Sequence, residues 1–537
     1  MLSYRKLAMR VLGHPLHTGG IDSPRPASQR AAAFILTAAM LTTLAAPAFA
    51  DIWRIEDGDI TVKAGETEGT NKVSQGENPE VEDTNTVITN SDKDKASSNT
   101  VTIEAKDKDD KVEVTLKDVN IDTSSRNKAA VSVTGEGDTN IKLDGDNALK
   151  SDIYRSGIYG SGSLTISGGE NDSLTAQGGS GANGISSSGS LTISGGTVTA
   201  NGDDGGRGIS SSGSVTISGG STVTANGGSG TISGGDGITS NGGVTISGGS
   251  TVTANGGNGG SLVGGSGISN GGSLTVSDGT VTAKGGNGDS KDGYGGDGIR
   301  SGGVVTISGN TVNAAGGYGG KVGGYGICSF DRVAISGGTV EAAGGNGSTG
   351  GGSGIYSSVI DLSGSLELTA KAGSPNGKAL SQKGSELVLD TIKDKLGPGA
   401  KVTATDADGK VIDQVSTPRP VEPEESSSSS DGGSAAPSAP ASPLPGLTVT
   451  DKDGQRISYT STQSGNTLTV CVGRLTASLH VSLAALRQLR AEGIETIAFQ
   501  TILCSTSLSV DELLTMGGED AEAVLTHRFT DSSLTVG

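Results

Sequence analysis

The chain has 537 residues, a formal net charge of −19, 92 glycines and only 3% aromatic residues. A strongly acidic surface repels phosphates, so the composition excludes a nucleic-acid partner and favours a soluble extracellular protein. Only two of the four histidines lie beyond residue 50. His480 is expected to be a strand residue, and His527 is expected to have an equally ordinary structural role.

Residues 1–50 are typical of a secretory signal peptide with a long leader. Five basic residues accompany an apolar segment (residues 31–46), which ends at the small-x-small site Ala48-Phe49-Ala50. The apolar run is short for a span, so an N-terminal anchor is the less favoured alternative. Removal of five basic residues and one acid changes the net charge from −19 to −23. We therefore expect a secreted protein without a transmembrane segment after cleavage.

Residues 51–150 predict an N-terminal cap and irregular first coils of a repeat array, whose open end must be covered. This part carries more charge and heavier side chains than the later repeats, and Ser91–Ser98 is expected to be an exposed loop. The candidate strands are Ile52–Ile55, Ile60–Lys63, Thr86–Thr89, Val101–Ala105, Val112–Ile121, Ala130–Thr134 and Asn140–Leu143.

Residues 151–415 contain a repeat marked by Gly-Ile steps 24 to 31 residues apart. Their glycines are Gly157, Gly184, Gly208, Gly237, Gly267, Gly298, Gly326 and Gly354. Most steps are followed by a Ser/Gly bend, a Val-Thr-Ile-Ser-Gly-Gly run, Thr-Val-Thr-Ala and a Gly-Gly pair. Such a period indicates a solenoid, a propeller or another array.

Within one repeat, Val215/Ile217 and Val223/Ala225 are each two residues apart, which places each pair on one face of a strand. One repeat cannot bury that face alone, whereas stacked repeats bury it continuously. We therefore expect an all-β fold, a parallel β-helix with three short strands per coil and glycines at the corners. Glycine-rich disorder would not keep the aliphatic register, collagen needs Gly at every third residue, and a propeller blade needs a longer unit.

The solenoid is expected to close with strands at Leu387–Leu389 and Val402–Val415. Residues 416–446 are rich in Pro, Ser and Glu and predict a disordered linker. Residues 447–537 predict a small α+β domain, with Ser482 as the N-cap of a helix over Leu483–Ala491 that stops at Gly493. The expected strands are Leu447–Thr450, Ile457–Thr460, Leu468–Val472, Leu475–Val481 and Ile494–Thr501, and a second helix follows Ser509 and ends near Gly517.

The three cysteines give no zinc or redox motif. Export would permit a Cys471–Cys504 disulfide, but two unpaired buried thiols fit the sequence equally well. Cys328 has no evident partner. The absence of histidine from the solenoid excludes catalytic triads and His-metal sites there.

Length variation falls between the Thr-Val-Thr-Ala run and the next Gly-Ile step, so insertions gather along one edge, where repeat proteins carry binding loops. Tyrosine planes with scattered charge at this edge could stack against sugar rings; loop packing is the alternative that the sequence favours. The candidate carbohydrate-binding residues are Tyr294, Tyr318, Tyr325, Tyr356, Lys321 and Arg300. The candidate Ca²⁺ ligands, for which solvated loops are the favoured alternative, are Asp203, Asp204, Asp236, Asp292 and Asp297.

Two repeats carry a specific resemblance: Asp236-Gly237-Ile238 with Val244–Gly249, and Asp297-Gly298-Ile299 with Val305–Gly309. They resemble secreted bacterial right-handed parallel β-helix proteins of the carbohydrate-binding-domain type. The segment Asn140–Asn147 also looks like the entry coil of glycine-rich, adhesin-like surface proteins from gut Gram-positive bacteria. The resemblance covers roughly residues 100–370 and implies binding of glycans without cleavage. It also implies that the Asp before a Gly-Ile step binds Ca²⁺ and acidic sugars. Most repeats of this chain carry another residue in place of that Asp.

The expected function is a secreted, non-catalytic carbohydrate-binding or adhesin-like surface protein with a polysaccharide or cell-surface glycan as partner. One alternative is a structural spacer that presents the C-terminal domain. A less favoured alternative is a polysaccharide lyase, for which Asp292, Asp297 and Arg300 would supply the charged groups. The sequence shows no C-terminal anchor, so attachment would run through a cell-envelope partner of the C-terminal domain. No cofactor other than Ca²⁺ is expected, and the sequence does not decide whether Ca²⁺ binds.

Overall fold

A computed structural model describes residues 52–418 and 446–536, the latter with gaps at 452–454, 458, 465, 473–475, 502–504, 517–520 and 529–530. The expected signal peptide, almost all of the expected linker and Cys504 therefore lie outside the described residues. The chain divides into two compact units, one that ends at Pro423 and one that begins at Glu424.

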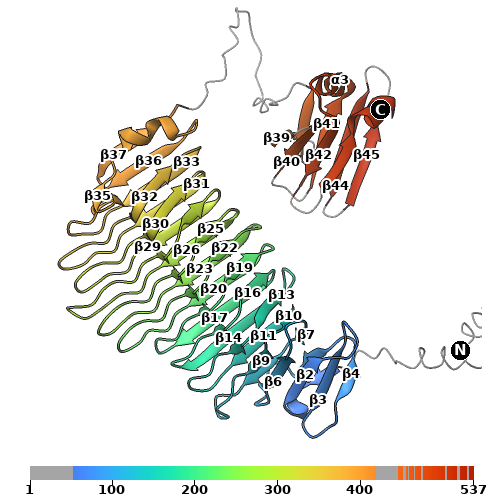
Figure 1. Cartoon of the computed structure of the whole chain (residues 1–537), viewed down its shortest axis with the longest axis vertical. Coiled ribbons are helices and arrows are strands. Elements are labelled where there is room, and N and C mark those ends of the chain that lie inside the picture. Colours follow the sequence, from blue (N-terminus) through green and yellow to red (C-terminus); the bar gives the residue numbers. More distant parts are fainter. Residues whose placement is uncertain are drawn as a thin grey trace, which may run out of the picture. The chain divides into compact units, whose positions relative to one another are not determined.

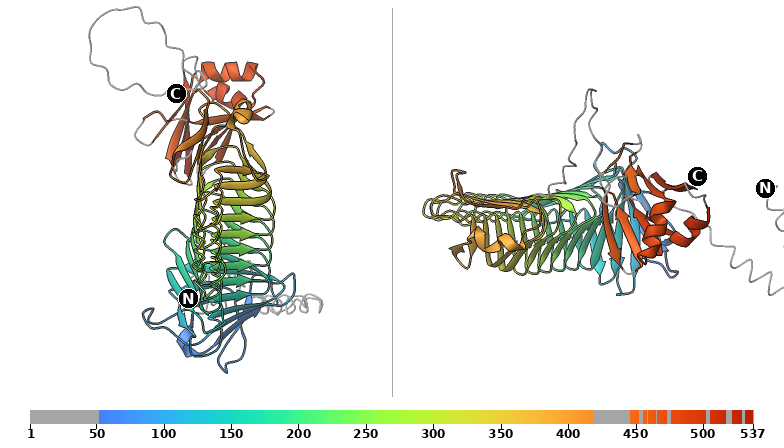
Figure 2. Two further views of the ribbon diagram at one scale, coloured as in Figure 1. Left: turned by 90° about the vertical axis from the view of Figure 1, so that its left-hand side faces the viewer. Right: turned by 90° about the horizontal axis from the view of Figure 1, so that it is seen from above.

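The first unit is a parallel β-solenoid, as the sequence predicts, and each regular coil contributes one strand to each of three ladders (Figure 1). Corresponding residues pair from coil to coil, for example Ile209 with Ile238 and Ile238 with Ile268, and the register shifts only locally, after Gln177 in β14 and after Ser329 in β30. This register keeps the aliphatic residue of each coil above that of the coil before it. Figure 2 shows the same stack from two further sides.

The first ladder holds the Gly-Ile steps. Its strands are β2 (Ile60–Ala64), β6 (Val101–Ala105), β9 (Val131–Gly135), β12 (Ile158–Gly160), β15 (Ile185–Ser187), β18 (Ile209–Ser211), β21 (Ile238–Ser240), β24 (Ile268–Asn270), β27 (Ile299–Ser301), β30 (Ile327–Ile335), β32 (Ile355–Leu362) and β34 (Leu380–Gln382). Strands β30 and β32 continue past the corner and also end the second ladder.

The second ladder holds the Val-Thr-Ile runs. Its other strands are β1 (Ile52–Arg54), β5 (Val87–Thr89), β7 (Lys111–Lys117), β10 (Asp138–Asp144), β13 (Ser163–Ser167), β16 (Leu191–Ser194), β19 (Val215–Ser218), β22 (Val244–Ile246), β25 (Leu274–Val276) and β28 (Val305–Ile307).

The third ladder holds the Thr-Val-Thr-Ala runs and forms a sheet of twelve strands. Its parallel strands are β8 (Asn120–Asp122), β11 (Asp146–Lys150), β14 (Ser173–Ser180), β17 (Thr197–Asp203), β20 (Thr222–Asn226), β23 (Ser250–Asn255), β26 (Gly279–Lys284), β29 (Thr311–Ala315), β31 (Gly338–Ala343), β33 (Leu366–Lys371) and β36 (Lys401–Thr405).

One hydrophobic core runs through this unit from Ile55 to Val415, because the inward residues of all three ladders are Val, Ile, Leu or Ala. A row of small polar residues, mostly serine, also points inward at the corner after each Gly-Ile step. Ser211, Ser240 and Ser329 are fully buried and donate to the corner carbonyls of Gly189, Gly213 and Gly303, each at 2.8 Å. These bonds satisfy the buried serine hydroxyl groups, and the carbonyls of Gly189 and Gly213 also accept a backbone N–H from the next coil.

Both ends of the solenoid carry antiparallel additions. At the start, β3 (Asn71–Gln75) and β4 (Val81–Asp83) fold back beside β2, and a short 3-10 helix, η1 (Ile55–Asp57), follows β1. At the end, β35 (Ser385–Glu386) pairs with β34, and β37 (Val411–Ser416) pairs with β36. Leu389, expected in a strand, begins the 3-10 helix η2 (Leu389–Lys395), and the expected strand Val402–Val415 is interrupted by a turn. These additions cover the edge of the first ladder at both ends and that of the third ladder at its C-terminal end.

The variable segments form a packed layer that we call the glycine arms (residues 227–236, 256–266, 285–297, 316–325 and 344–353). Each arm leaves the third ladder, turns, and returns to the first ladder. An unbroken series of N–H···O bonds of 2.8–3.0 Å alternates between outgoing and returning segments. It joins Gly206, Gly228, Gly235, Gly257, Gly265, Gly286, Gly296, Gly317, Gly324, Gly345, Gly352 and Gly373.

Glycine is required in the arms because neighbouring backbones touch. A Cβ at Gly257 would overlap the carbonyl group of Gly228, and one at Gly265 would overlap that of Gly235. These glycines therefore serve close backbone approach, whereas the sequence suggested only corners. The arms are the row of stacked loops, green to yellow, in Figure 1.

The described residues of the second unit form two four-stranded sheets and two helices with a separate core. One sheet has the order β38 (Leu447–Thr450), β41 (Thr476–Ser482), β44 (Glu522–Arg528), β45 (Asp531–Val536). The other has the order β39 (Thr460–Ser464), β40 (Thr467–Cys471), β42 (Thr496–Gln500), β43 (Ser505–Ser509). Helix α3 (Leu483–Ala491) has its predicted bounds, Ser482 accepts from the N–H of Ala485, and α4 spans Val510–Met516.

Candidate functional site

Three of the six residues predicted to bind carbohydrate line a groove of about 530 Å³, where the returning glycine arms enter the first ladder. We call it the tyrosine groove. Tyr294, Arg300 and Tyr325 line it together with Asp236 and Asp297, and glycines form much of its floor. Four consecutive coils contribute, so the groove exists only in the stacked solenoid.

Tyr325 and Tyr356 form the aromatic wall beside this groove. Their ring centroids are 4.9 Å apart and their planes are inclined by 19°. Tyr325 precedes the step Gly326-Ile327, whereas Tyr356 follows the step Gly354-Ile355 of the next coil. Burial raises the pKa of the half-buried Tyr325 phenol, which therefore stays neutral over the physiological range.

Arg300 is held in place between an acid and a ring. One of its guanidinium nitrogens lies 3.0 Å from Oδ2 of Asp297, and the guanidinium carbon lies 4.8 Å from the ring centroid of Phe330. The Arg300 side chain stays 46% exposed, whereas that of Asp297 is 7% exposed. The arginine thus presents donors to solvent in a fixed place.

Tyr294 lies on a returning arm between Val263 and Val322, which pair with it on either side. Lys321 Nζ lies 5.6 Å from the centre of its ring, a cation–π distance. The structure therefore groups five of the six predicted carbohydrate-binding residues: Tyr294, Arg300, Lys321, Tyr325 and Tyr356.

Tyr318 is the sixth, and it does not line the groove. It lies on an outgoing arm, where its N–H donates to Oδ1 of Asn287 in the previous coil at 2.9 Å. Its side chain is as exposed as that of Tyr294, at 47% against 46%. Tyr318 and Tyr294 therefore form a matched pair of exposed arm tyrosines, inside and outside the groove.

Asp236 and Asp297, which directly precede Gly-Ile steps, each accept a backbone N–H from the next coil. Asp236 Oδ1 accepts from the N–H of Ser266 at 2.7 Å, and Asp297 Oδ1 accepts from the N–H of Tyr325 at 2.8 Å, each one coil further on. The second oxygen of Asp236 accepts from the Thr239 hydroxyl, 2.9 Å away. Burial raises the pKa of Asp297, although its bonds to Tyr325 and Arg300 oppose that shift.

The remaining predicted Ca²⁺ ligands lie apart from this pair. Asp203 is the last residue of β17, Asp204 begins the turn that follows with a φ of 43°, and Asp292 is exposed near the tip of an arm. Within the described parts of the chain, no three His, Cys, Asp or Glu side chains gather closely enough to hold a metal ion. The five aspartates thus do not form one site.

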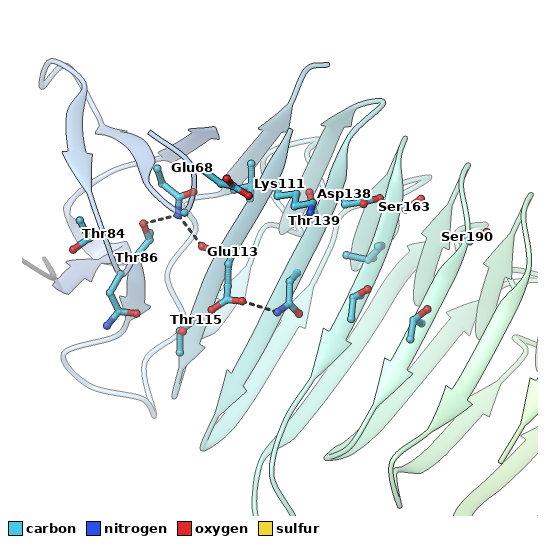
Figure 3. Close-up of a pocket in the computed structure, with 18 residues that line it drawn as sticks. Glu68, Thr84, Thr86, Lys111, Glu113, Thr115, Asp138, Thr139, Ser163 and Ser190 are labelled. Carbon is cyan, nitrogen blue, oxygen red and sulfur yellow. Dashed lines mark hydrogen bonds between the residues drawn. The ribbon is translucent and has the colours of Figure 1, made fainter. Parts of the chain in front are cut away.

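A larger groove of about 630 Å³ lies near the N-terminal end, on the outer face of the second ladder (Figure 3). Its lining is polar and contains no aromatic residue. Asn140 Nδ2 donates to a carboxylate oxygen of Glu113 at 2.9 Å, and Asn71 Nδ2 donates to the Thr86 hydroxyl at 2.9 Å. The buried hydroxyl of Thr139, also in the lining, has no hydrogen-bond partner. Without ring faces, this groove is a weaker candidate for sugar stacking.

In the second unit, His480 lies in β41, where a strand was expected, and His527 lies in β44, a strand that the sequence did not predict. His480 contacts Thr450 and Glu522, and His527 is fully buried between the hydroxyls of Thr501 and Thr506. Burial lowers the pKa of His527. Cys471 is a free thiol, and the proposed Cys471–Cys504 pairing involves a residue outside the described ones.

The sequence did not predict that Phe330, Val263 and Cys328 lie in or beside the tyrosine groove. Phe330 is exposed and replaces a glycine at the corner, Gly302 in the preceding coil. An aromatic residue at a corner where the other coils carry Gly, Ser or Asn was the available signal. Cys328 follows Ile327 at an outward position yet is 1% exposed, because residues of neighbouring coils cover it.

Comparisons with known proteins do not supply a family for this chain. No family model matches it. No curated protein matches its sequence, and no solved structure matches it. Among the described residues, no helix has the length and apolar character needed to cross a membrane.

Proposed function

We propose that this protein is a non-catalytic carbohydrate-binding protein of the secreted, adhesin-like kind, and that the tyrosine groove binds an acidic polysaccharide. The observation that carries the proposal is the stacked pair Tyr325–Tyr356 beside the anchored guanidinium of Arg300. Ring faces pack against sugar rings, and a fixed guanidinium forms paired hydrogen bonds with a carboxylate.

The charge distribution supports an acidic ligand. The chain carries a net charge of −19, yet Arg300 lines the groove, Lys321 adjoins it and Arg207 lies 3.7 Å from Asp236 of its lining. Because the protein as a whole is acidic, these cations favour binding of a polyanion at the tyrosine groove over binding elsewhere on the surface.

The bonding of the aspartates supports binding without cleavage. Asp236 and Asp297 each use one oxygen to hold a backbone N–H and the other to hold a side-chain donor. A general acid or base needs a carboxyl group that can reach the substrate proton. Because Asp297 is engaged in the stack, the lyase alternative is left with the exposed Asp292 as its candidate carboxylate.

A panel of immobilised polysaccharides tests the proposal: polygalacturonate, cellulose and mucin, each with Ca²⁺ and with a chelator. We expect retention on polygalacturonate that Arg300→Gln weakens and that Arg332→Gln, a change at an equally exposed arginine paired with Asp361, leaves unchanged. Failure of every polysaccharide to retain the full chain overturns the proposal. Loss of retention on chelation alone would instead show a metal-dependent site.

The second candidate is a structural spacer, which the continuous core and the hydrogen-bonded glycine arms favour because they make a stiff rod. Under that function, attachment to cells depends on the C-terminal unit and an envelope partner. Deletion of residues 447–537 would then abolish attachment, whereas Tyr294→Ala would leave it unchanged.

A further inference from the structure

A second groove with aromatic and basic walls lies on the outer face of the first ladder, several coils before the tyrosine groove. It has a volume of about 560 Å³ and is lined by Tyr154, Arg155 and Tyr159, with Lys128 and Ser186 beside them. We call it the Tyr154 groove. None of these residues belongs to the site described above.

The geometry of the Tyr154 groove is fixed by its backbone. Tyr154 adopts a φ of 59°, a left-handed conformation that a tyrosine rarely takes. Its N–H donates to the carbonyl of Ser180 at 2.9 Å, and its ring lies directly over Gly181, where a Cβ would be 2.9 Å from two ring carbons. The ring nevertheless remains 78% exposed. Strained backbone that holds an aromatic ring in solvent is a feature of binding surfaces.

Arg155 and Tyr159 complete the groove. Nε of Arg155 donates to Oδ1 of Asn127 in the preceding coil at 3.2 Å, which holds the guanidinium at the wall. Tyr159 points outward from β12 and is 43% exposed. The Tyr154 groove and the tyrosine groove are thus each lined by two tyrosines and a tethered arginine.

Strand register places the two grooves on one line. Tyr159 pairs with Ser186, and the same row continues coil by coil to Arg300. Its members are Tyr159, Ser186, Ser210, Thr239, Ser269 and Arg300. Five steps of about 4.8 Å each separate the ends by about 24 Å along the stack.

The surface between the grooves suits a polar chain. The intervening row members are half-buried serine and threonine residues, which offer hydroxyl groups and no bulky obstruction. Arg207, in the coil of Ser210, adds a guanidinium whose side chain is 47% exposed. Residues 151–372 contain four arginines, and three of them, Arg155, Arg207 and Arg300, follow this line.

We propose that the Tyr154 groove and the tyrosine groove are the two ends of one track that binds a single acidic polysaccharide chain along the solenoid axis. This inference rests on the proposed function and names its ligand more closely, as a linear polyuronate long enough to reach both grooves. Ring faces hold sugar units at each end, and the line of arginines meets the carboxylates between them. Joining two weak subsites in one ligand raises affinity without new contacts at either.

The test measures binding of end-labelled oligogalacturonates, a trimer and a dodecamer, to the full chain. We expect the dodecamer to bind at least tenfold more tightly than the trimer to the unaltered protein. Tyr159→Ala and, independently, Arg155→Gln should each reduce dodecamer affinity several-fold and leave trimer binding at the tyrosine groove unchanged. Tyr318→Ala is the matched control, and a thermal melt identical to that of the unaltered chain shows that each variant folds.

The outcomes separate the two proposals. A dodecamer can occupy a single groove in more registers than a trimer, which by itself raises its apparent affinity. The decisive comparison is therefore between each variant and the unaltered protein, and not between dodecamer and trimer. If Tyr159→Ala and Arg155→Gln leave dodecamer affinity unchanged while Arg300→Gln weakens both oligomers, the track is refuted and the proposed function stands. If neither oligomer binds the unaltered chain, the acidic-polysaccharide function fails and the track fails with it.

Discussion

The ring of Tyr325 lies against that of Tyr356 from the next coil, with centroids 4.9 Å apart. Neither tyrosine could form this contact within its own repeat, since one precedes a Gly-Ile step and the other follows one. The thiol of Cys328 lies in the same row as Arg300 and Tyr356, which pair on either side of it, and it is 1% exposed. Stacking of coils thus creates the aromatic wall and buries the Cys328 thiol.

Tyr356→Ala should expose Cys328. Burial, reinforced by the negative charge of Asp297, raises the pKa of this thiol to about 12, so the reactive thiolate is scarce in the unaltered protein. Removal of the ring should increase the alkylation rate of Cys328 at pH 8, as followed by peptide mass spectrometry, which distinguishes it from the other two cysteines. Tyr318→Ala should not change the rate. Equal rates in all three proteins would show that the tyrosine does not cover the thiol.

Gly286→Ala should destabilise the solenoid by about 1–3 kcal/mol, because the added methyl overlaps the carbonyl group of Gly257 in the preceding arm. Gly350→Ala is the control, since a Cβ there would only touch the Val322 side chain at 3.8 Å. Urea unfolding of the full chain measures both. Similar losses in the two variants would mean that the arms do not pack backbone to backbone.

Asp297→Asn and Asp297→Ala should differ in stability. The amide oxygen of asparagine can still accept the N–H of Tyr325, and burial already raises the pKa of Asp297, so a neutral side chain suits the site. Alanine leaves that N–H without its acceptor, which costs about 1–3 kcal/mol. Thermal unfolding at pH 7 checks the order. An asparagine variant as unstable as the alanine variant would contradict the capping role.

The second unit should lose stability in mild acid. Burial lowers the pKa of His527 below its ordinary 6.5, so the folded state prefers the neutral ring between Thr501 and Thr506. Its contribution to stability is therefore complete above pH 6.5 and is lost as pH falls through the lower folded pKa. Hydrogen exchange in β44 at pH 7 and pH 5 measures this change. His527→Gln should reduce the pH dependence, and an unchanged dependence would assign it to other groups.

Much of the fold could be predicted because the aliphatic register of residues such as Val215 and Ile217 repeats in every coil. The antiparallel cap strands β3 and β4 were missed, since their sequence is polar and their pairing with β2 is not periodic. Strands β43, β44 and β45 were also missed in the second unit. The register of the arms could not be inferred, because glycine pairs do not show which backbone they contact.

The sequence could predict which residues belong to the candidate site but not how they are arranged. Tyr294, Tyr325 and Tyr356 could be selected because aromatics are rare at this edge. Which arm segment carries each tyrosine depends on where the arm turns, and the arm lengths differ, so Tyr318 could not be separated from Tyr294. Tyr154 and Tyr159 gave a comparable signal, but only the ladder register aligns them with Arg300.

The affinity of the full chain for polygalacturonate, measured by titration calorimetry, tests the central claim most directly. Tyr294→Ala and Tyr325→Ala should each weaken binding about tenfold, or about 1.4 kcal/mol, whereas Tyr318→Ala should leave it unchanged. If Tyr318→Ala weakens binding as much as Tyr294→Ala does, or if no tyrosine matters, the tyrosine groove is not the carbohydrate site.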